Sequence, residues 1–281
     1  MNRPLPPVFA LALAALVGGC SLPNGTALGN SPDPNDPWSA RTLVWSDEFS
    51  GAAVDTTKWT YDLGGGGWGN GELETYTQAN ATIQPVNGAS CLVITASKDT
   101  NGAWTSARLK TQGLQTFSSG KIEARIKLPR GQGMWPAFWA LGANISTVGW
   151  PACGETDILE MIGGSTGANS DSKVYGTLHW KDATTGGHDS YQPEKYVLGS
   201  GAFADAFHVF GIDWTASRVT YFLDGMQVGS MGITDVSMGA TFQKPFFLIL
   251  NLAVGGNWPG NPDSTTPTVQ TMAVDWVRVY Q

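Results

Sequence analysis

Alternation of apolar and polar residues is the clearest pattern in this chain, and it predicts β-strands. In segment 121–128 every second residue is apolar and most of the residues between are charged, as in a strand with one buried face. Segments 246–250 and 273–280 are typical of buried or central strands. Asp224-Gly225, inside another apolar stretch, predicts the turn of a hairpin. No strand–helix alternation occurs, so we predict an all-β fold, a two-sheet antiparallel β-sandwich.

Three carboxylates crowd into six residues of an otherwise apolar segment, at Glu155, Asp157 and Glu160. On a helix, at about 100° per residue, no single face would hold all three. On a strand Glu155 and Asp157 share one face, and Glu160 joins them only if one extra residue is inserted after Asp157 as a β-bulge. The spacing therefore predicts a bulged strand.

The flanks of this strand argue for chemistry over an ordinary solvated acidic face. Segments 150–154 and 161–164 are apolar or small, and no Lys or Arg occurs between Arg130 and Lys173. Carboxylates that are desolvated together repel one another, which spreads their pKa values apart. Retaining glycosidases use two carboxyl groups about 5 Å apart, and two inward-leaning Glu side chains on such a strand can approach that separation.

Residues 154–160 match the Glu-x-Asp-x-x-Glu signature of glycoside hydrolase family 16, in the bulged form associated with laminarinases, the endo-β-1,3-glucanases. Six more segments resemble the family in family order: 43–49, 68–73, 121–129, 133–139, 176–180 and 251–259. The resemblance covers residues 39–281 and implies a concanavalin-like jelly roll whose concave face carries a glycan-binding cleft. Two positions depart from the family pattern, Thr156, where an aliphatic residue is usual, and Gly71, which is often polar.

The resemblance and the carboxylates together predict a mechanism. Glu155 is the expected nucleophile and Glu160 the acid/base, so the configuration of the sugar is retained. Asp157 is expected to assist by hydrogen-bonding the nucleophile and keeping Glu160 protonated. The predicted function is hydrolysis of internal β-1,3 bonds of a β-glucan, or of a β-1,3-1,4-glucan.

Two alternatives stay open on the sequence. One is a hydrolase or transglycosylase of another specificity on the same scaffold, for instance for lichenan or agar. The other is a non-catalytic β-glucan-binding protein, which the intact acids disfavour because a lectin has no use for an acid/base pair.

The chain contains 12 Trp, and an indole offers a sugar an apolar face with a polar edge. Tryptophans among Gly and Pro are predicted to stack on sugars: Trp68, Trp135, Trp150 and Trp258. Tryptophans within alternating strands are predicted to pack in the core: Trp45, Trp59, Trp214 and Trp276. The resemblance adds substrate contacts from four further residues: Trp139, Asn70, Glu72 and Arg108.

His179 shares a predicted strand face with Thr177 and Tyr175. A substrate-binding position next to Glu160 and a purely structural role are both open for it.

Composition fits one catalytic domain over residues 39–281. The 36 Gly, 16 Pro and 14% charged residues indicate short strands joined by many turns. The net charge of −7 disfavours nucleic acid and fits a neutral polysaccharide partner. We expect a monomer that needs no cofactor.

Residues 1–20 read as a lipoprotein-type signal peptide, with an apolar run over 9–17 and a Val-Gly-Gly-Cys20 end that resembles a bacterial lipobox. Residues 21–38 read as a flexible linker. We therefore expect an exported lipoprotein of the cell envelope, at the outer membrane or cell surface, that touches the membrane only through a lipid on Cys20. The alternative is an ordinary secretory signal and a secreted protein.

Two further sets of residues leave open questions. Cys91 and Cys153 could form a disulfide or remain buried thiols. Some family members hold a Ca²⁺ far from the cleft, and Glu48 with Asp275 is the matching carboxylate pair, although calcium needs six or more oxygens.

Overall fold

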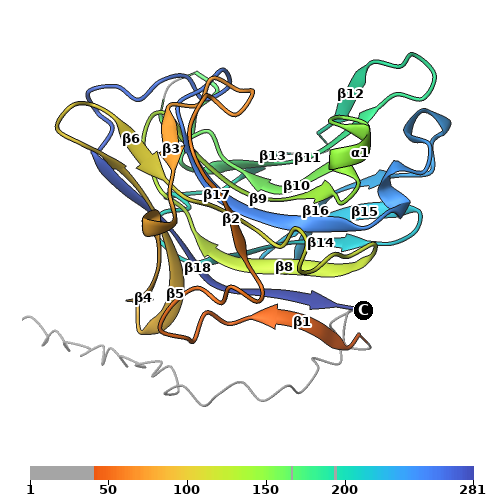
Figure 1. Cartoon of the computed structure of the whole chain (residues 1–281), viewed down its shortest axis with the longest axis horizontal. Coiled ribbons are helices and arrows are strands. Elements are labelled where there is room, and N and C mark those ends of the chain that lie inside the picture. The colour runs from red at the N-terminus through yellow and green to blue at the C-terminus, as the bar shows by residue number, and fades with distance from the viewer. Residues whose placement is uncertain (1–40, 166, 193–194) are drawn as a thin grey trace, which may run out of the picture. The chain divides into compact units, whose positions relative to one another are not determined.

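The computed structural model describes residues 41–281 except 166, 193 and 194, and these residues form two packed β-sheets (Figure 1). The predicted signal peptide, Cys20 and linker lie outside the described residues. None of the helices in the described segments is long and apolar enough to cross a membrane. The predicted all-β, two-sheet antiparallel sandwich is confirmed.

Ten strands form the larger sheet: β1 (Leu43–Asp47), β3 (Glu74–Tyr76), β4 (Ala81–Val86), β5 (Ala89–Lys98), β6 (Trp104–Ser106), β8 (Gly120–Lys127), β14 (His208–Trp214), β15 (Arg218–Leu223), β16 (Met226–Gly232) and β18 (Val269–Tyr280). Their order is β16-β15-β14-β8-β18-β5-β6-β3, with β1 beside β18 and β4 beside β5. β3 and β6 pair in parallel, and the other pairs of this sheet are antiparallel.

Eight strands form the smaller sheet: β2 (Thr60–Asp62), β7 (Arg108–Lys110), β9 (Met134–Gly142), β10 (Glu155–Glu160), β11 (Lys173–Lys181), β12 (His188–Tyr191), β13 (Lys195–Val197) and β17 (Phe246–Val254). Their order is β12-β11-β10-β9-β17-β7-β2, with β13 beside β11. The helices are single turns: η1 (Gln78–Asn80), α1 (Ile145–Val148), η2 (Val236–Met238) and η3 (Thr241–Gln243).

The alternating pattern places the core between the sheets. Ile122, Ala124 and Ile126 of β8 are fully buried, as their period of two predicts. β17 lies between β9 and β7 in the middle of the sheet and is buried along its whole length. The predicted hairpin joins β15 to β16, and both Asp224 (φ 49°) and Gly225 (φ 78°) have the positive φ that a type I′ turn requires.

The core tryptophans were predicted correctly except at one position. Trp59 and Trp214 are fully buried and Trp45 packs against the same core. Trp276 is instead half-buried, with the Arg278 guanidinium 4.2 Å from its ring centre. The register between β18 and β8 shifts at Asp275, so this extra residue sends both Asp275 and Trp276 away from the core.

Cys91 and Cys153 are both buried free thiols and belong to different apolar clusters. The sequence left a disulfide and two buried thiols as alternatives, and the structure has the two thiols.

Candidate active site

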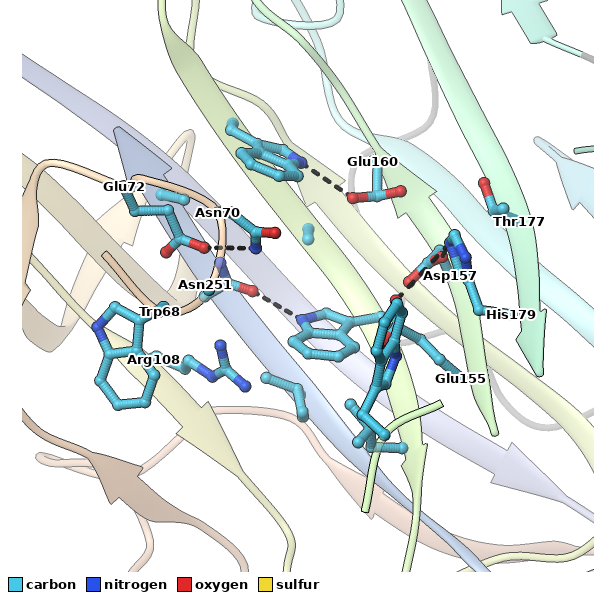
Figure 2. Close-up of a pocket in the computed structure, with 18 of the residues that line it drawn as sticks. Trp68, Asn70, Glu72, Arg108, Glu155, Asp157, Glu160, Thr177, His179 and Asn251 are labelled. Carbon is cyan, nitrogen blue, oxygen red and sulfur yellow. Dashed lines mark hydrogen bonds and ion pairs between the residues drawn. The ribbon is translucent and has the colours of Figure 1, made fainter. Parts of the chain in front are cut away.

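Alternate residues of neighbouring strands face the concave side of the smaller sheet and line a cleft of about 990 Å³ (Figure 2). The three predicted catalytic acids lie on its floor, on β10. The cleft is also lined by every residue predicted to bind substrate: Asn70, Glu72, Arg108, Trp135, Trp139, Trp150, His179 and Trp258.

The predicted bulge is present in β10. Asp157 pairs with Thr177 of β11 and Glu160 pairs with Tyr175, so three steps along β10 match two along β11. The two residues between, Ile158 and Leu159, are both buried in the core. One extra residue on the core side thus returns Glu160 to the cleft side.

Thr156 is fully buried and lies on the opposite face of β10 from the acids. Its departure from the family pattern therefore does not reach the cleft. At the other departure, Gly71 has φ +72°, a conformation that side-chain-bearing residues rarely adopt.

Two indole N–H groups fix the outer carboxyls. Trp150 Nε1 donates to Glu155 Oε2 at 3.0 Å, and Trp135 Nε1 donates to Glu160 Oε1 at 2.9 Å. The tryptophans predicted to stack on sugar thus also hold the acids in place.

His179 lies against Asp157 and Glu155, and not next to Glu160, which was one of the two alternatives that the sequence left open. Its Nε2 is 3.3 Å from Asp157 Oδ2 and 3.8 Å from Glu155 Oε1, while Tyr175 is the residue opposite Glu160. The strand register decides this, because the bulge displaces Glu160 along β11. Burial raises the pKa of Glu160, and a positive charge on His179 opposes that rise.

The acidic cluster retains protons near neutral pH. Burial raises the pKa of Asp157 to about 8. Burial, with the charge of Asp157 added, raises the pKa of Glu160 to about 8. Burial and then Asp157 raise the pKa of Glu155 well above its ordinary value, while His179 and the hydrogen bond from Trp150 oppose the rise. Three carboxyls this close do not all ionise at neutral pH.

Aromatic rings form the walls of the cleft beyond the acids. The Arg108 guanidinium lies 5.1 Å from the ring centre of Trp68 and 4.8 Å from that of Trp139, and its Nε binds Asp62 at 3.0 Å. Trp258 packs against Trp135 and Tyr175, with ring centres 5.6 and 5.1 Å apart. Such apolar walls with polar edges suit a sugar chain.

Sequence reasoning gave no role to three residues that support the site. Asn251 accepts a hydrogen bond from Trp139 Nε1 at 2.7 Å, and Tyr76 receives one from Asn251 at 3.2 Å. His188 Nε2 contacts His179 Nδ1 at 3.0 Å. Asn251 did carry a signal, as the one polar residue in the apolar β17, but nothing near His188 marks it.

The carboxylates suggested for calcium do not fit that ion. Both oxygens of Glu48 bind Arg278, at 2.9 and 2.7 Å, and Asp275 binds Arg125 at 2.6 Å. Guanidinium groups thus neutralise both acids. Potential ligand atoms do gather at Glu155, Asp157 and His179, within 4.8 Å of one another, but these atoms belong to the acidic cluster itself.

An acidic cluster on the floor of an aromatic-walled cleft, on a curved jelly roll, defines a glycoside hydrolase. Residues 71–278 match the model of Glycosyl hydrolases family 16, and this chain belongs to that family.

Individual proteins agree with the family match. The chain is 36% identical over 293 residues to the Beta-glucanase of Rhodothermus marinus, covering 97% of this chain and 93% of that protein. The laminarinase catalytic domain from Thermotoga maritima MSB8 has a similar structure, with 43% identity and a TM-score of 0.75 over 86% of this chain and 98% of that domain.

Other relatives are longer proteins. The Clotting factor G alpha subunit of Tachypleus tridentatus is 37% identical over 244 residues, which are 85% of this chain and 34% of that protein. The chain therefore spans about a third of the length of that relative.

Proposed function

We propose that this protein is a retaining endo-β-1,3-glucanase that hydrolyses internal bonds of laminarin-type β-glucans, and β-1,3-1,4-glucans as further substrates. The bulge in β10 carries the proposal, because it brings Glu155, Asp157 and Glu160 onto one cleft face. Relatives that are named beta-glucanase and laminarinase support the substrate class.

In the first step, the Glu155 carboxylate attacks the anomeric carbon and forms an ester bond to the sugar. Glu160 gives its proton to the departing glycosidic oxygen, which leaves as a hydroxyl group. In the second step, Glu160 takes a proton from water, the water oxygen attacks the same carbon, and Glu155 leaves as a carboxylate. The proton returned to Glu160 closes the cycle.

Contacts of the two glutamates support this division of roles. Burial and the charge of Asp157 raise the pKa of Glu155, and the charge of His179 and the Trp150 N–H oppose that rise, so these two contacts are the ones that favour the ionised nucleophile. Burial and the charge of Asp157 hold the pKa of Glu160 at about 8, so that this acid keeps its proton at neutral pH. Asp157 thereby tunes both partners.

The reaction is carried by the protein's own carboxyls, and family 16 glucanases generally need no cofactor. A structural calcium at Glu48 and Asp275 forms no part of the proposal, because each carboxylate already binds an arginine.

Product analysis tests the activity. Laminarin, lichenan, agarose and xyloglucan would be incubated with the protein and with Glu155→Gln as the inactive control. We expect laminarin to be cut into oligosaccharides by the wild type alone, and proton NMR to show the β anomer first. An initial α anomer would exclude double displacement. Binding to laminarin without cleavage would favour the glucan-binding alternative.

The cellular setting is part of the same proposal. The lipobox-like segment that ends at Cys20, followed by the Pro-rich segment 21–38, supports an exported protein held at the outer membrane or cell surface by a lipid. A fatty-acid analogue should label the wild type and not Cys20→Ala. Equal labelling of the two, or release of the mature wild type into the medium, would contradict the anchor and favour a secreted enzyme.

A further inference from the structure

A second acidic pair is buried at the far end of the cleft from the catalytic cluster. Glu72 lies two residues before Glu74 and Tyr76 of β3, and all three are buried, whereas Leu73 and Thr75 between them are exposed, so the three point to one side of this segment. Glu72 is 8% exposed, and Glu74 and Tyr76 are each 1% exposed. Within the described part of the chain, neither glutamate has an ion-pair partner among the salt bridges. Burying two adjacent negative charges is costly, so one of the pair is expected to carry a proton.

A chain of hydrogen bonds identifies the ionised member. The indole N–H of Trp139 can only donate, so Asn251 accepts it through Oδ1, at 2.7 Å. The remaining amide group of Asn251 can only donate, and it donates to the Tyr76 hydroxyl at 3.2 Å. The Tyr76 hydroxyl then donates a hydrogen bond to Glu72 Oε2, at 3.0 Å.

Glu72 thus accepts hydrogen bonds from two sides. Its other oxygen, Oε1, accepts from Asn70 Nδ2 at 2.9 Å (Figure 2). Two accepted hydrogen bonds, one on each oxygen, favour the charged form of a carboxyl, so Glu72 is the carboxylate of the pair.

Glu74 has the opposite environment. Its Oε2 accepts a hydrogen bond from the Val254 N–H at 2.7 Å. Its Oε1 is buried and has no hydrogen-bond partner among the described residues. The pKa of Glu74 is raised to about 8, mainly by burial and next by the neighbouring Glu72. An ionised Glu74 would leave a buried charged oxygen unpartnered, whereas a protonated one carries a donor there.

We propose that Glu74 is an uncharged carboxylic acid that donates to the Glu72 carboxylate and is a positioning residue for the Asn70–Glu72 end of the cleft. The strands β6 and β17, which pack beside Glu74, carry no titratable side chain. Glu72 and Tyr76 are therefore the ionisable groups that face Glu74. Burial raises the pKa of Tyr76, and the charge of Arg108 opposes that rise. The bonds from Glu74 and Tyr76 hold Glu72, and Glu72 orients the Asn70 amide with its oxygen free for a sugar hydroxyl.

Thermal unfolding tests the proton without any substrate. Glu74→Gln copies the neutral acid in shape and in donor capacity. Wild-type Glu74 keeps its proton when folded and loses it when unfolded between pH 4.5 and about 8, so its contribution to stability falls across that range. The Tm of Glu74→Gln minus that of the wild type should therefore rise steadily with pH over this interval. The catalytic acids titrate in both proteins and cancel.

Glu48→Gln is the matched control, because Arg278 already holds Glu48 ionised over this range and lowers its pKa. Its Tm difference from the wild type should stay level above pH 4.5. A level difference for Glu74→Gln as well would overturn the proposal, since Glu74 would then be ionised like Glu48.

Kinetics on laminarin test the positioning, which rests on the proposed function, whereas the Tm experiment does not. Glu74→Gln should keep KM within about twofold, and Glu74→Ala should raise KM by about tenfold with a kcat close to that of the wild type. A wild-type KM in Glu74→Ala would overturn the positioning role. If Glu74→Ala does not fold, Glu74→Leu takes its place with the same expectation.

Discussion

Acidic side chains project from the outward faces of both sheets, but the side chains next to them differ in the sign of their charge. On the larger sheet Glu48 binds Arg278 and Asp275 binds Arg125, and Arg278 lowers the pKa of Glu48. In the cleft, Glu160 and its fellow acids face one another, and burial raises their pKa values. Burial and the charge of the nearest neighbour together therefore decide whether an acid stabilises the fold or can exchange protons with a substrate.

The largest effect is expected when the nucleophile is removed from the cleft cluster. Glu155→Gln keeps the size of the side chain and should lower kcat on laminarin by at least about 10⁴-fold. Steady-state rates with a circular-dichroism check of folding measure this. A pure, folded variant with more than about a tenth of wild-type activity would rule out the nucleophile role.

The next effect concerns the proton on Glu160. Activity of the wild type should fall as pH rises through about 8, because Glu160 then loses the proton that the leaving oxygen needs. Glu160→Gln should lose about 10²- to 10⁴-fold on laminarin and less on an aryl glucoside, whose leaving group needs no proton. A pH profile of kcat/KM on both substrates measures this, and an equal loss on both would contradict the acid/base role.

A change to the bulge separates placement from chemistry. Deleting Leu159 leaves Glu-Thr-Asp-Ile-Glu, in which a regular strand holds all three acids on one face. Since Leu159 is fully buried, the free energy of unfolding should fall by about 2–5 kcal/mol, while activity remains measurable. Denaturant unfolding and laminarin assays test this.

Leu159→Ala is the control for that deletion, because it removes the same packing and keeps the bulge. An inactive deletion variant beside an active Leu159→Ala of equal stability would show that the bulge itself is required.

The smallest effect is expected when the ion pair between Glu48 and Arg278 on the larger sheet is removed. The Glu48 side chain is 42% exposed, so solvent screens its ion pair and Glu48→Gln should cost under about 1 kcal/mol at neutral pH. Because the pKa of Glu48 is lowered, this deficit should shrink as pH falls below 4.5. The kcat on laminarin should not change, and a tenfold loss would break the contrast between the two faces.

A comparison of two of the bulges, in β10 and in β18, shows how much of the fold the sequence predicts. Acids at Glu155, Asp157 and Glu160 make sense on one strand face only with an extra residue, so the bulge in β10 was predictable. The bulge in β18 falls at Asp275, where no spacing of chemical groups reveals it, and Trp276 was consequently assigned to the wrong face. A bulge leaves a trace in the sequence only if the residues around it must share a side.

The cleft residues divide in the same way. The tryptophans, the acids and Asn70, Glu72 and Arg108 could be named because residue type and motif mark them. The contacts of His179 with Asp157 and His188 required the register of β10, β11 and β12.

The sequence by itself determined which residues are buried along a regular strand such as β8, where the main hairpin turns and which acids share a face, because these follow from the period of two in the backbone and from the turn residues. Tertiary structure alone decided which charge each acid meets. Glu48 and Arg278 are 230 positions apart in the chain, and Glu74 meets the N–H of Val254 180 positions away. Such neighbours come from strand pairing and sheet packing, which no local pattern encodes.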